Sequence, residues 1–225
     1  MRAPISVVIP TLNAEQSLPE TLRSLVEGLE AGLIRELIIS DGGSQDASGA
    51  IAQAWGAEVI TGPPSRGGQL RRSCAAARGD WLLILHADTR LSEGWSKTVL
   101  QHLASSQQAG WFRLRFDGGG WPGRLVAGWA NLRSRAGLPY GDQGLLLPRA
   151  LYEHVGGFDD VPLMEDVRIA RALKGHLQGL DAFAITSAAK YHQQGWLRRG
   201  GRNLLTLIRY FMGRDVEALA RSYRR

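Results

Sequence analysis

Three polar segments in the first half of the chain each follow an apolar run, and each could bind a ligand. They are residues 10–13 (Pro-Thr-Leu-Asn), 41–46 (Asp-Gly-Gly-Ser-Gln-Asp) and 86–89 (His-Ala-Asp-Thr). In a parallel α/β sheet, ligands bind outside the carboxyl ends of the strands. Each segment alone is also consistent with an ordinary turn. The three together favour one shared ligand pocket.

The His86-Ala87-Asp88 segment is the candidate metal site, because it directly follows an all-apolar strand. The carboxylate of Asp88 suits Mg²⁺ or Mn²⁺, which prefer oxygen ligands and would lie against a phosphate-bearing substrate. His86 can ligate Mn²⁺ but suits Mg²⁺ poorly. Two simpler interpretations stay open: Asp88 caps the helix that opens near Ser92, and His86 is a hydrogen-bonded residue at a strand end.

Glu165 and Asp166 form the candidate catalytic pair at the start of a predicted helix. A hydroxyl that attacks another group must lose its proton, and a positioned carboxylate can accept it as a general base. Acidic residues are also favoured at a helix N-terminus for purely electrostatic reasons, so ordinary capping is the alternative.

Strand-like and helical segments alternate through the first half of the chain, which indicates an α/β protein with a mostly parallel sheet flanked by crossover helices. After residue 107 the alternation becomes less regular. Expected strands cover 5–9, 36–40, 57–61, 81–86, 111–117, 144–147 and 177–186, and expected helices cover 17–30, 47–55, 69–77, 92–105, 121–136, 165–174, 203–212 and 215–223.

The composition is that of a globular protein: 44% of the 225 residues are hydrophobic and 21% are charged. This length suits one sizeable α/β domain, expected over 1–225, with a nucleotide-binding half (about 1–106), an acceptor half (about 107–189) and a basic tail (190–225). No apolar run approaches the ~20 residues of a bilayer-spanning helix. A single cysteine, Cys74, excludes an internal disulfide framework. We therefore expect a cytoplasmic protein.

The excess positive charge lies in the tail. The chain carries a net charge of +6, and residues 190–225 hold nine basic and two acidic side chains. Three interpretations of this tail stay open. It can rest on an anionic membrane surface through 196–214, it can pack its apolar side on the core, or it can close over a bound diphosphate. No base-reading motif is present, so we expect no nucleic-acid partner.

Several segments resemble, in order and spacing, the family 2 glycosyltransferases of GT-A fold. The resemblance runs from about residue 5 to residue 173. Within it, His-Ala-Asp in place of the family's Asp-X-Asp, and Gly-Asp-Gln-Gly at 141–144, look like a compact bacterial subgroup without assigned substrates. The segments that carry it are 7–13, 39–46, 79–88, 155–159 and 164–167.

The resemblance implies an inverting transferase that uses a UDP- or GDP-linked sugar, a divalent metal (Mn²⁺ or Mg²⁺) and an acceptor hydroxyl. It implies that Asp166 is the general base, with Glu165 beside it. Ala14, Gly42 and His86 depart from the family pattern, which often has acidic residues at these positions. The implied donor-side residues are Pro10, Thr11, Asp41, Arg66, Gln69 and Asp142, and the implied metal ligands are Asp88 and His86.

Two rival interpretations follow from the same residues. A non-catalytic protein that kept this fold would bind a membrane or a partner through its arginine-rich tail. A nucleotidyltransferase would be expected to carry a glycine-rich loop with a lysine after the first strand. Residues 11–15 (Thr-Leu-Asn-Ala-Glu) contain neither glycine nor lysine, which disfavours this second rival.

Overall fold

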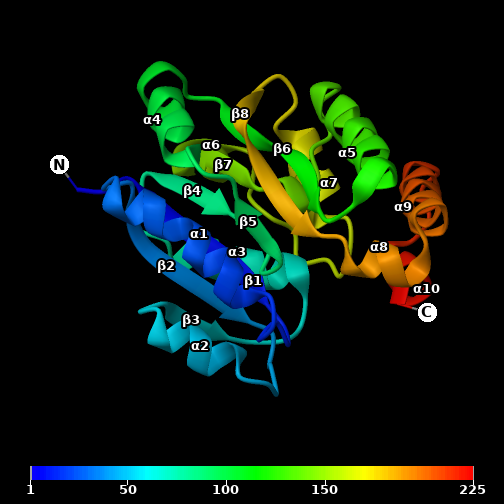
Figure 1. Cartoon of the computed structure of the whole chain (residues 1–225), viewed down its shortest axis with the longest axis horizontal. Coiled ribbons are helices and arrows are strands. Elements are labelled where there is room, and N and C mark those ends of the chain that lie inside the picture. Colours follow the sequence, from blue (N-terminus) through cyan, green and yellow to red (C-terminus); the bar gives the residue numbers. More distant parts are fainter. Residues whose placement is uncertain (1, 225) are drawn as a thin grey trace.

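The computed structural model describes residues 2–224, and for residues 190 and 224 it describes the backbone only. One eight-stranded mixed sheet runs through the molecule, with helices packed against it (Figure 1). The strand order is β3-β2-β1-β4-β7-β6-β8-β5. The strands are β1 (Ile5–Thr11), β2 (Ile34–Asp41), β3 (Glu58–Thr61), β4 (Trp81–Ile84), β5 (Thr89–Leu91), β6 (Ala109–Asp117), β7 (Leu145–Pro148) and β8 (Leu177–Ser187).

The first four strands form the parallel half of the sheet, with β1 between β2 and β4. Strand β1 is buried except at Pro10 because helices cover both faces of the sheet, and this explains its mostly apolar sequence. On α1, the residues Leu18, Leu22 and Leu25 recur at helical spacing and are buried in the core. The helices of this half are α1 (Leu18–Glu30), α2 (Ser48–Ala54), α3 (Arg66–Ala76) and α4 (Trp95–Ser105).

The second half of the sheet is mixed. Strand β7 pairs antiparallel with both β4 and β6, while β6 and β8 are parallel to each other. The expected α/β fold with a mostly parallel sheet is thus confirmed, with the antiparallel pairs confined to this half. The remaining helices are α5 (Gly120–Arg135), the short 3₁₀ helix η1 (Gly141–Gln143), α6 (Arg149–His154), α7 (Glu165–Ala172), α8 (Ala189–Gln194), α9 (Trp196–Phe211) and α10 (Val216–Arg224).

Several element boundaries differ from the sequence predictions. Helix α3 begins three residues earlier than expected, because the Ser65 hydroxyl accepts the backbone N–H of Gly68 and caps it. The predicted helix over 92–105 begins only at Trp95, because residues 92–94 form the turn that connects it to the edge strand β5. Helix α9 begins at Trp196, seven residues before the expected start. Helices α6 and α8 were not predicted, since each is only six residues long.

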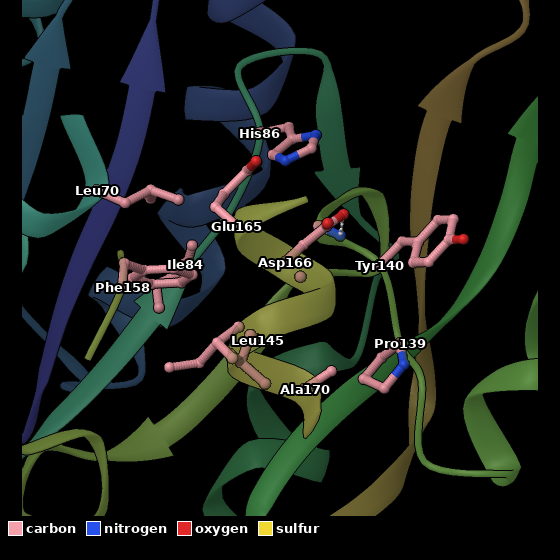
Figure 2. A pocket seen from close by; sticks show the side chains of 13 residues that line it. Leu70, Ile84, His86, Pro139, Tyr140, Leu145, Phe158, Glu165, Asp166 and Ala170 are labelled. Atoms are coloured by element: carbon pink, nitrogen blue, oxygen red, sulfur yellow. Dashed lines mark hydrogen bonds between the residues drawn. The ribbon is translucent and has the colours of Figure 1, made fainter. Parts of the chain in front are cut away.

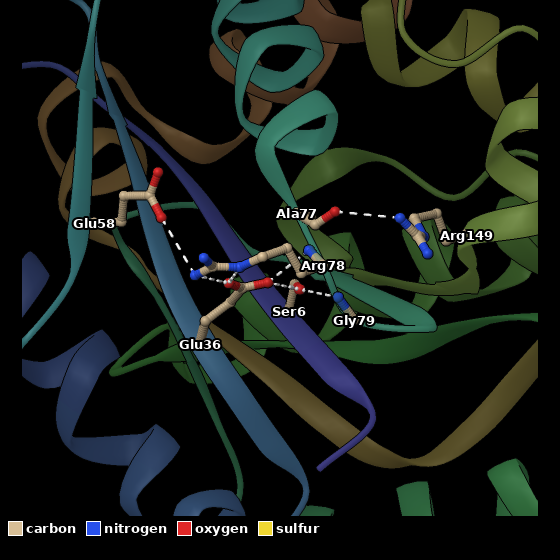
Figure 3. A network of polar contacts seen from close by, with 7 residues as sticks. All are labelled: Ser6, Glu36, Glu58, Ala77, Arg78, Gly79 and Arg149. Carbon is tan, nitrogen blue, oxygen red and sulfur yellow. Dashed lines mark hydrogen bonds and ion pairs between the residues drawn. The ribbon is translucent and has the colours of Figure 1, made fainter. Parts of the chain in front are cut away.

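A polar network closes the edge of the sheet at the amino ends of β1 and β4 (Figure 3). The Ser6 hydroxyl donates to Glu36 Oε1 at 2.5 Å and accepts the backbone N–H of Gly79 at 2.8 Å. The backbone N–H of Arg78 donates to the same Glu36 oxygen at 2.6 Å, and its guanidinium contacts the other oxygen. These bonds hold the pKa of Glu36 below its ordinary value of 4.5, although burial of the carboxylate works in the opposite direction.

In the part of the chain that the structure describes, no helix is long and apolar enough to cross a bilayer.

Candidate functional site

The carboxyl ends of β1, β2 and β4 meet at one edge of the sheet, as the parallel pairing requires. Thr11 and Asp41 are register partners, and the backbone N–H of Gly42 donates to the Thr11 carbonyl at 2.9 Å. Two of the three predicted polar segments therefore lie side by side. The third begins at His86, just beyond the end of β4, the other neighbour of β1.

Gln69 on α3 holds this edge together. Its side-chain Nε2 donates to the Thr11 carbonyl at 2.9 Å and to the Ser40 carbonyl at 2.7 Å, and the side chain is buried. Both carbonyls lie near the carboxyl ends of their strands, and the Thr11 carbonyl accepts the Gln69 amide in addition to the backbone N–H of Gly42. Gln69 thus fixes the floor of the predicted nucleotide site, beneath the surface that a nucleotide would contact.

Asp41 shapes the turn that follows β2. Its carboxylate accepts the backbone N–H of Ser44 at 3.0 Å and the Ser44 hydroxyl at 2.6 Å. The turn passes through Gly43, whose φ of 91° is the left-handed conformation that glycine adopts without strain. Pro10 lies next to this turn at the end of β1 and is half-buried. Pro10, Thr11 and Asp41, three of the predicted nucleotide contacts, therefore lie close together. The hydrogen bonds from Ser44 fix the orientation of the Asp41 carboxylate.

Arg66 links the two halves of the site. It is the first residue of α3, and its Nε lies 3.5 Å from Glu165 Oε1 on α7. Partial burial works against the guanidinium charge, but the carboxylates of Glu165, Asp166 and Asp88 outweigh it and raise the pKa of Arg66. A fixed cation among three predicted site carboxylates is suited to meeting the phosphates of a ligand.

Glu165 and Asp166 begin α7 and line a pocket together with His86 and Tyr140 (Figure 2). The residue before them, Met164, has a φ of 67°, a conformation that a non-glycine residue rarely adopts. Strain of this kind is held in place by surrounding structure, and Met164 is indeed buried. The turn at Met164 starts the helix so that both acidic side chains face the end of β4.

Asp166 is held in a fixed orientation by backbone donors. Its Oδ2 accepts the N–H of Gly141 at 3.0 Å (Figure 2). Its Oδ1 accepts the N–H of Val167 at 2.7 Å. A carboxylate has about four acceptor positions, so capacity for a further donor is left. This geometry is compatible with the predicted role as a general base.

Glu165 is buried in an unusual way: its side chain is 1% exposed, and within the described residues neither oxygen has a hydrogen-bond partner. Burial first, and the neighbouring charge of Asp166 second, raise the pKa of Glu165 to about 7, while Arg66 opposes this shift. A carboxylate this deeply buried, with a 3.5 Å ion pair to Arg66 in place of short hydrogen bonds, is destabilising in the unliganded protein. Such a group marks a functional site more often than a structural one.

Asp142 in η1 is a second carboxylate of this kind. Burial raises the pKa of Asp142 to about 6; Arg133 opposes this shift, whereas Asp166 and Asp88 add to it. Its Oδ1 is buried and has no partner among the residues described. The next residue, Gln143, is fully buried and hydrogen-bonds the Ser134 hydroxyl, so it anchors the turn from below and leaves Asp142 as the side chain at the site.

Asp88 and His86 come from the loop after β4, and both are partly exposed. No group of three or more histidine, cysteine or acidic side chains within the described residues is arranged to hold a metal ion. One carboxylate and one imidazole nonetheless fit a cation of the Mn²⁺ type, because such ions commonly complete their shell with substrate phosphates and water. The unsatisfied carboxylate oxygens of Asp142 and Glu165 add negative charge to the same region.

Three further aromatic side chains, two tryptophans and a histidine, lie away from the pocket. Trp121 and Trp129 on α5 are 67% and 58% exposed, so they belong neither to the core nor to the site. His192 contacts the carbonyl of Gly118, away from the pocket. Nothing in the sequence singles out Gly141 within the segment 141–144. In the structure, a Cβ at this position would overlap the imidazole of His86. Only a glycine lets the turn and the histidine approach each other so closely.

Comparison with known sequences identifies related proteins. The model of the family described as Glycosyl transferase family 2 matches residues 6–143. A glucosyl-3-phosphoglycerate synthase of Mycolicibacterium paratuberculosis is 37% identical over 93 residues, which cover 37% of this chain and 28% of that protein. An uncharacterized glycosyltransferase of Mycobacterium bovis is 29% identical over 145 residues, covering 61% of this chain and 63% of the relative. The chain thus spans less than two thirds of the length of these relatives.

Solved structures show the same GT-A architecture. The glucosyl-3-phosphoglycerate synthase of Mycobacterium tuberculosis, in complex with Mn²⁺, UDP and phosphoglyceric acid, has a TM-score of 0.55 at 26% identity, over 82% of this chain and 68% of that one. A mannosyltransferase from Pyrobaculum calidifontis, in complex with GDP-Man and Mn²⁺, has a TM-score of 0.69 over 96% of this chain and 65% of that one. Its 18% identity shows a shared fold alone.

Proposed function

Since the chain belongs to glycosyl transferase family 2, we propose that it transfers a sugar from a nucleoside-diphosphate sugar to an acceptor hydroxyl, with inversion at the anomeric carbon. The observation that carries this proposal is the meeting of Arg66, Glu165 and Asp166 at the carboxyl edge of the parallel strands. These residues come from both halves of the sequence. Glu165 and Asp166 line one pocket, and the Arg66 cation forms an ion pair with Glu165.

The donor nucleotide is proposed to lie across the ends of β1 and β2, against Pro10, Thr11 and Asp41. The turn after Asp41 offers backbone groups and a carboxylate suited to a base or a ribose. Arg66 would contact the diphosphate, where a cation stabilises the charge that develops on the leaving group. Relatives in complexes with UDP or GDP-Man make uridine and guanosine donors the first to test.

Asp88 and His86 would hold a divalent cation next to the diphosphate, and this ion would supply Lewis-acid stabilisation of the departing phosphate oxygen. The chemistry of the two ligands favours Mn²⁺ over Mg²⁺, because imidazole suits the former better. The Mn²⁺ in the related synthase structure at 26% identity supports this preference.

The transfer step is a single displacement. The acceptor oxygen attacks the anomeric carbon from the face opposite the diphosphate, and its proton passes to a carboxylate oxygen of Asp166. The bond between the anomeric carbon and the phosphate oxygen breaks, and its electron pair leaves with the nucleoside diphosphate. Glu165 keeps Arg66 in place, and Asp142 is proposed to orient a hydroxyl of the sugar or of the acceptor.

We propose a cytoplasmic location for this reaction. The acceptor is proposed to be a hydroxyl compound, and phosphoglycerate is the first to test because of the named relatives. An absence of nucleic-acid partners remains a prediction.

A panel of nucleotides tests the donor site. UDP, GDP, UDP-glucose and GDP-mannose are added with and without Mn²⁺ or Mg²⁺, and the melting temperature is recorded. A ligand at 100 times its Kd stabilises the folded state by about 2.7 kcal/mol, which is readily measured. We expect a metal-dependent shift with one nucleotide family. In Asp88→Ala the metal dependence should be lost, whereas the control Asp181→Ala, at an exposed position, should behave like the wild type.

Turnover separates an enzyme from a binding protein. We expect release of the nucleoside diphosphate from the bound sugar nucleotide, slowly by hydrolysis and faster with an acceptor. A specific shift without any turnover would support the non-catalytic alternative. No shift with any nucleotide, in a folded sample, would contradict the proposed function altogether.

A further inference from the structure

Helix α5 has two apolar faces, and only one of them is used by the fold. Ala127 and Ala130 face inward and pack in a cluster with Leu114 and Phe116 of β6. The opposite face is formed by large apolar side chains spaced four, four and three residues apart, which puts them on one stripe of the helix. This stripe, termed the α5 ridge, consists of Trp121, Leu125, Trp129 and Leu132, and all four are exposed.

Helix α9 repeats the arrangement. Thr206 and Leu207 are its buried residues, and Leu207 packs against Met164 and Val167 at the start of α7. Most of its large apolar side chains lie on the other side, and Leu197 is 93% exposed. The interpretation in which the tail packs its apolar side on the core is therefore wrong for this helix. The exposed side, termed the α9 face, consists of Leu197, Leu204, Leu205, Ile208 and Phe211, followed by Met212.

The two helices lie at the same end of the molecule, away from α2 and the amino terminus (Figure 1). They touch where both begin, because the indole of Trp196 packs against Gly119 and Gly123. Isolated exposed apolar residues are ordinary on a protein surface. Ten of them on two adjoining helices form a patch of the kind that marks an interaction site.

The charged side chains on the two helices themselves are all positive, and the acidic residues nearest in sequence, such as Asp117 and Asp215, lie outside them. Helix α5 carries three arginines and α9 carries four, and neither sequence contains an aspartate or a glutamate. On α9, Arg198, Arg202 and Arg209 lie along one edge of the apolar face at helical spacing. A second copy of the chain is a poor partner for this surface, since a symmetric contact would bring like charges together.

We propose that the α5 ridge and the α9 face together dock the protein on the surface of an anionic lipid bilayer. The apolar side chains would enter the boundary between headgroups and acyl chains, and the arginines would contact the lipid phosphates. Trp121 and Trp129 suit this boundary, because an indole ring combines a large apolar body with one hydrogen-bond donor. This proposal does not depend on the proposed reaction, since docking requires neither a donor nor a metal.

Co-sedimentation of the full chain with lipid vesicles tests the proposal. The vesicles contain phosphatidylcholine alone or phosphatidylcholine mixed with phosphatidylglycerol, each at low and at high salt. We expect binding to the mixed vesicles and a loss of binding as salt rises. Leu197→Ser with Ile208→Ser on α9, and Trp121→Ser with Trp129→Ser on α5, should each weaken binding by about tenfold or more.

Charge variants and controls complete the design. Arg198→Glu and Arg209→Glu should each weaken binding to the mixed vesicles by roughly fivefold or more. Leu29→Ser on α1 and Lys97→Glu on α4 change exposed residues outside the patch and should bind like the wild type. All the changed side chains are exposed, so circular dichroism and melting temperature should show a folded protein throughout.

Three results would overturn the proposal. One is the absence of binding to the mixed vesicles. Another is an equal loss of binding in the control variants. The third is a wild-type dimer in sedimentation velocity that the patch variants dissociate, without any vesicle binding; the patch would then be an interface between two copies.

Discussion

The backbone N–H of Gly141 donates a 3.0 Å hydrogen bond to Oδ2 of Asp166, and the same glycine lies against the imidazole of His86. One residue of the η1 turn thus touches both the candidate base on α7 and the candidate metal ligand after β4. Since Asp142 follows directly, any shift of this turn would move an acidic side chain as well. The relative positions of the candidate catalytic groups therefore depend on a residue that has no side chain.

Gly141→Ala should impair activity without unfolding the protein. The new Cβ would overlap His86 and push the turn away from Asp166. A displacement of about 1 Å at a catalytic group can reduce turnover about 10²-fold. The check is kcat together with the melting shift that the donor produces in the presence of Mn²⁺. Gly128→Ala in α5 is the matched control, since open space surrounds that position, and it should keep full activity and gain about 0.5–1 kcal/mol of stability.

Asp166→Asn should bind the donor normally and lose turnover by about 10²–10⁴-fold. The asparagine retains an oxygen that can accept the Gly141 N–H, but it cannot take the acceptor's proton. Donor affinity comes from the melting shift and turnover from release of nucleoside diphosphate. Asp181→Asn, at a highly exposed position, is the control and should be unaffected. Near-normal transfer by Asp166→Asn would remove this residue from the role of base.

Glu165→Gln should stabilise the unliganded protein and reduce its activity. The folded-state pKa of Glu165 is raised to about 7 from 4.5, so the native state holds this proton more tightly than the unfolded state does. The contribution of Glu165 to the free energy of unfolding of the wild type is therefore fully present below pH 4.5. It is lost as the pH rises through about 7. The glutamine has no charge to bury, so its advantage in the free energy of unfolding should be larger above pH 7 than below pH 5. Urea unfolding at the two pH values measures this. An advantage that does not change with pH would contradict the argument.

Glu36 gives the opposite pH dependence, far from the site. Its pKa is lowered below 4.5 in the folded protein, so its stabilising contribution is present above pH 4.5 and is lost as the pH falls through the lowered pKa. Glu36→Gln should cost about 1–3 kcal/mol of unfolding free energy at neutral pH. The difference from wild type should shrink below pH 4.5. Because this network closes the other edge of the sheet, activity per folded molecule should stay unchanged.

The sequence predicted the parallel half of the fold well, because the central strands β1 and β4 are almost entirely buried and α1 carries a clear apolar stripe. It did not predict β5, which is only three residues long and follows His86-Ala87-Asp88 directly. It also placed the start of α9 too late. Residues 198–202 are arginines and glycines without an apolar repeat, and most large apolar residues of this helix face outward. Short elements and outward-facing patterns carry little local signal.

For the candidate site too, the sequence predicted some features and not others. Motif spacing was sufficient to select Asp41, Asp88 and Asp166, since each follows or begins a recognisable element. It could not show that Gln69 binds two carbonyls beneath the site, that Glu165 lacks hydrogen-bond donors or that Met164 adopts a positive φ. Each of these facts depends on contacts between residues distant in the sequence, or on backbone conformation that no residue type dictates.

Strand β4 is the seam of the sheet: it is parallel to β1 on one side and antiparallel to β7 on the other. The reversal brings residues that follow β4 and residues that precede β7 to the same edge, so Asp88 and Asp142 share a site although one follows a strand and the other comes before one. The proposed donor residues Pro10, Thr11 and Asp41 come from the β1 and β2 side of β4, and the candidate acceptor residues come from the other side. Changes in α5, or in residues 136–140 that connect it to η1, should therefore alter the proposed acceptor contacts and leave the proposed nucleotide contacts as they are. The same sheet can in this way serve different acceptors with one donor.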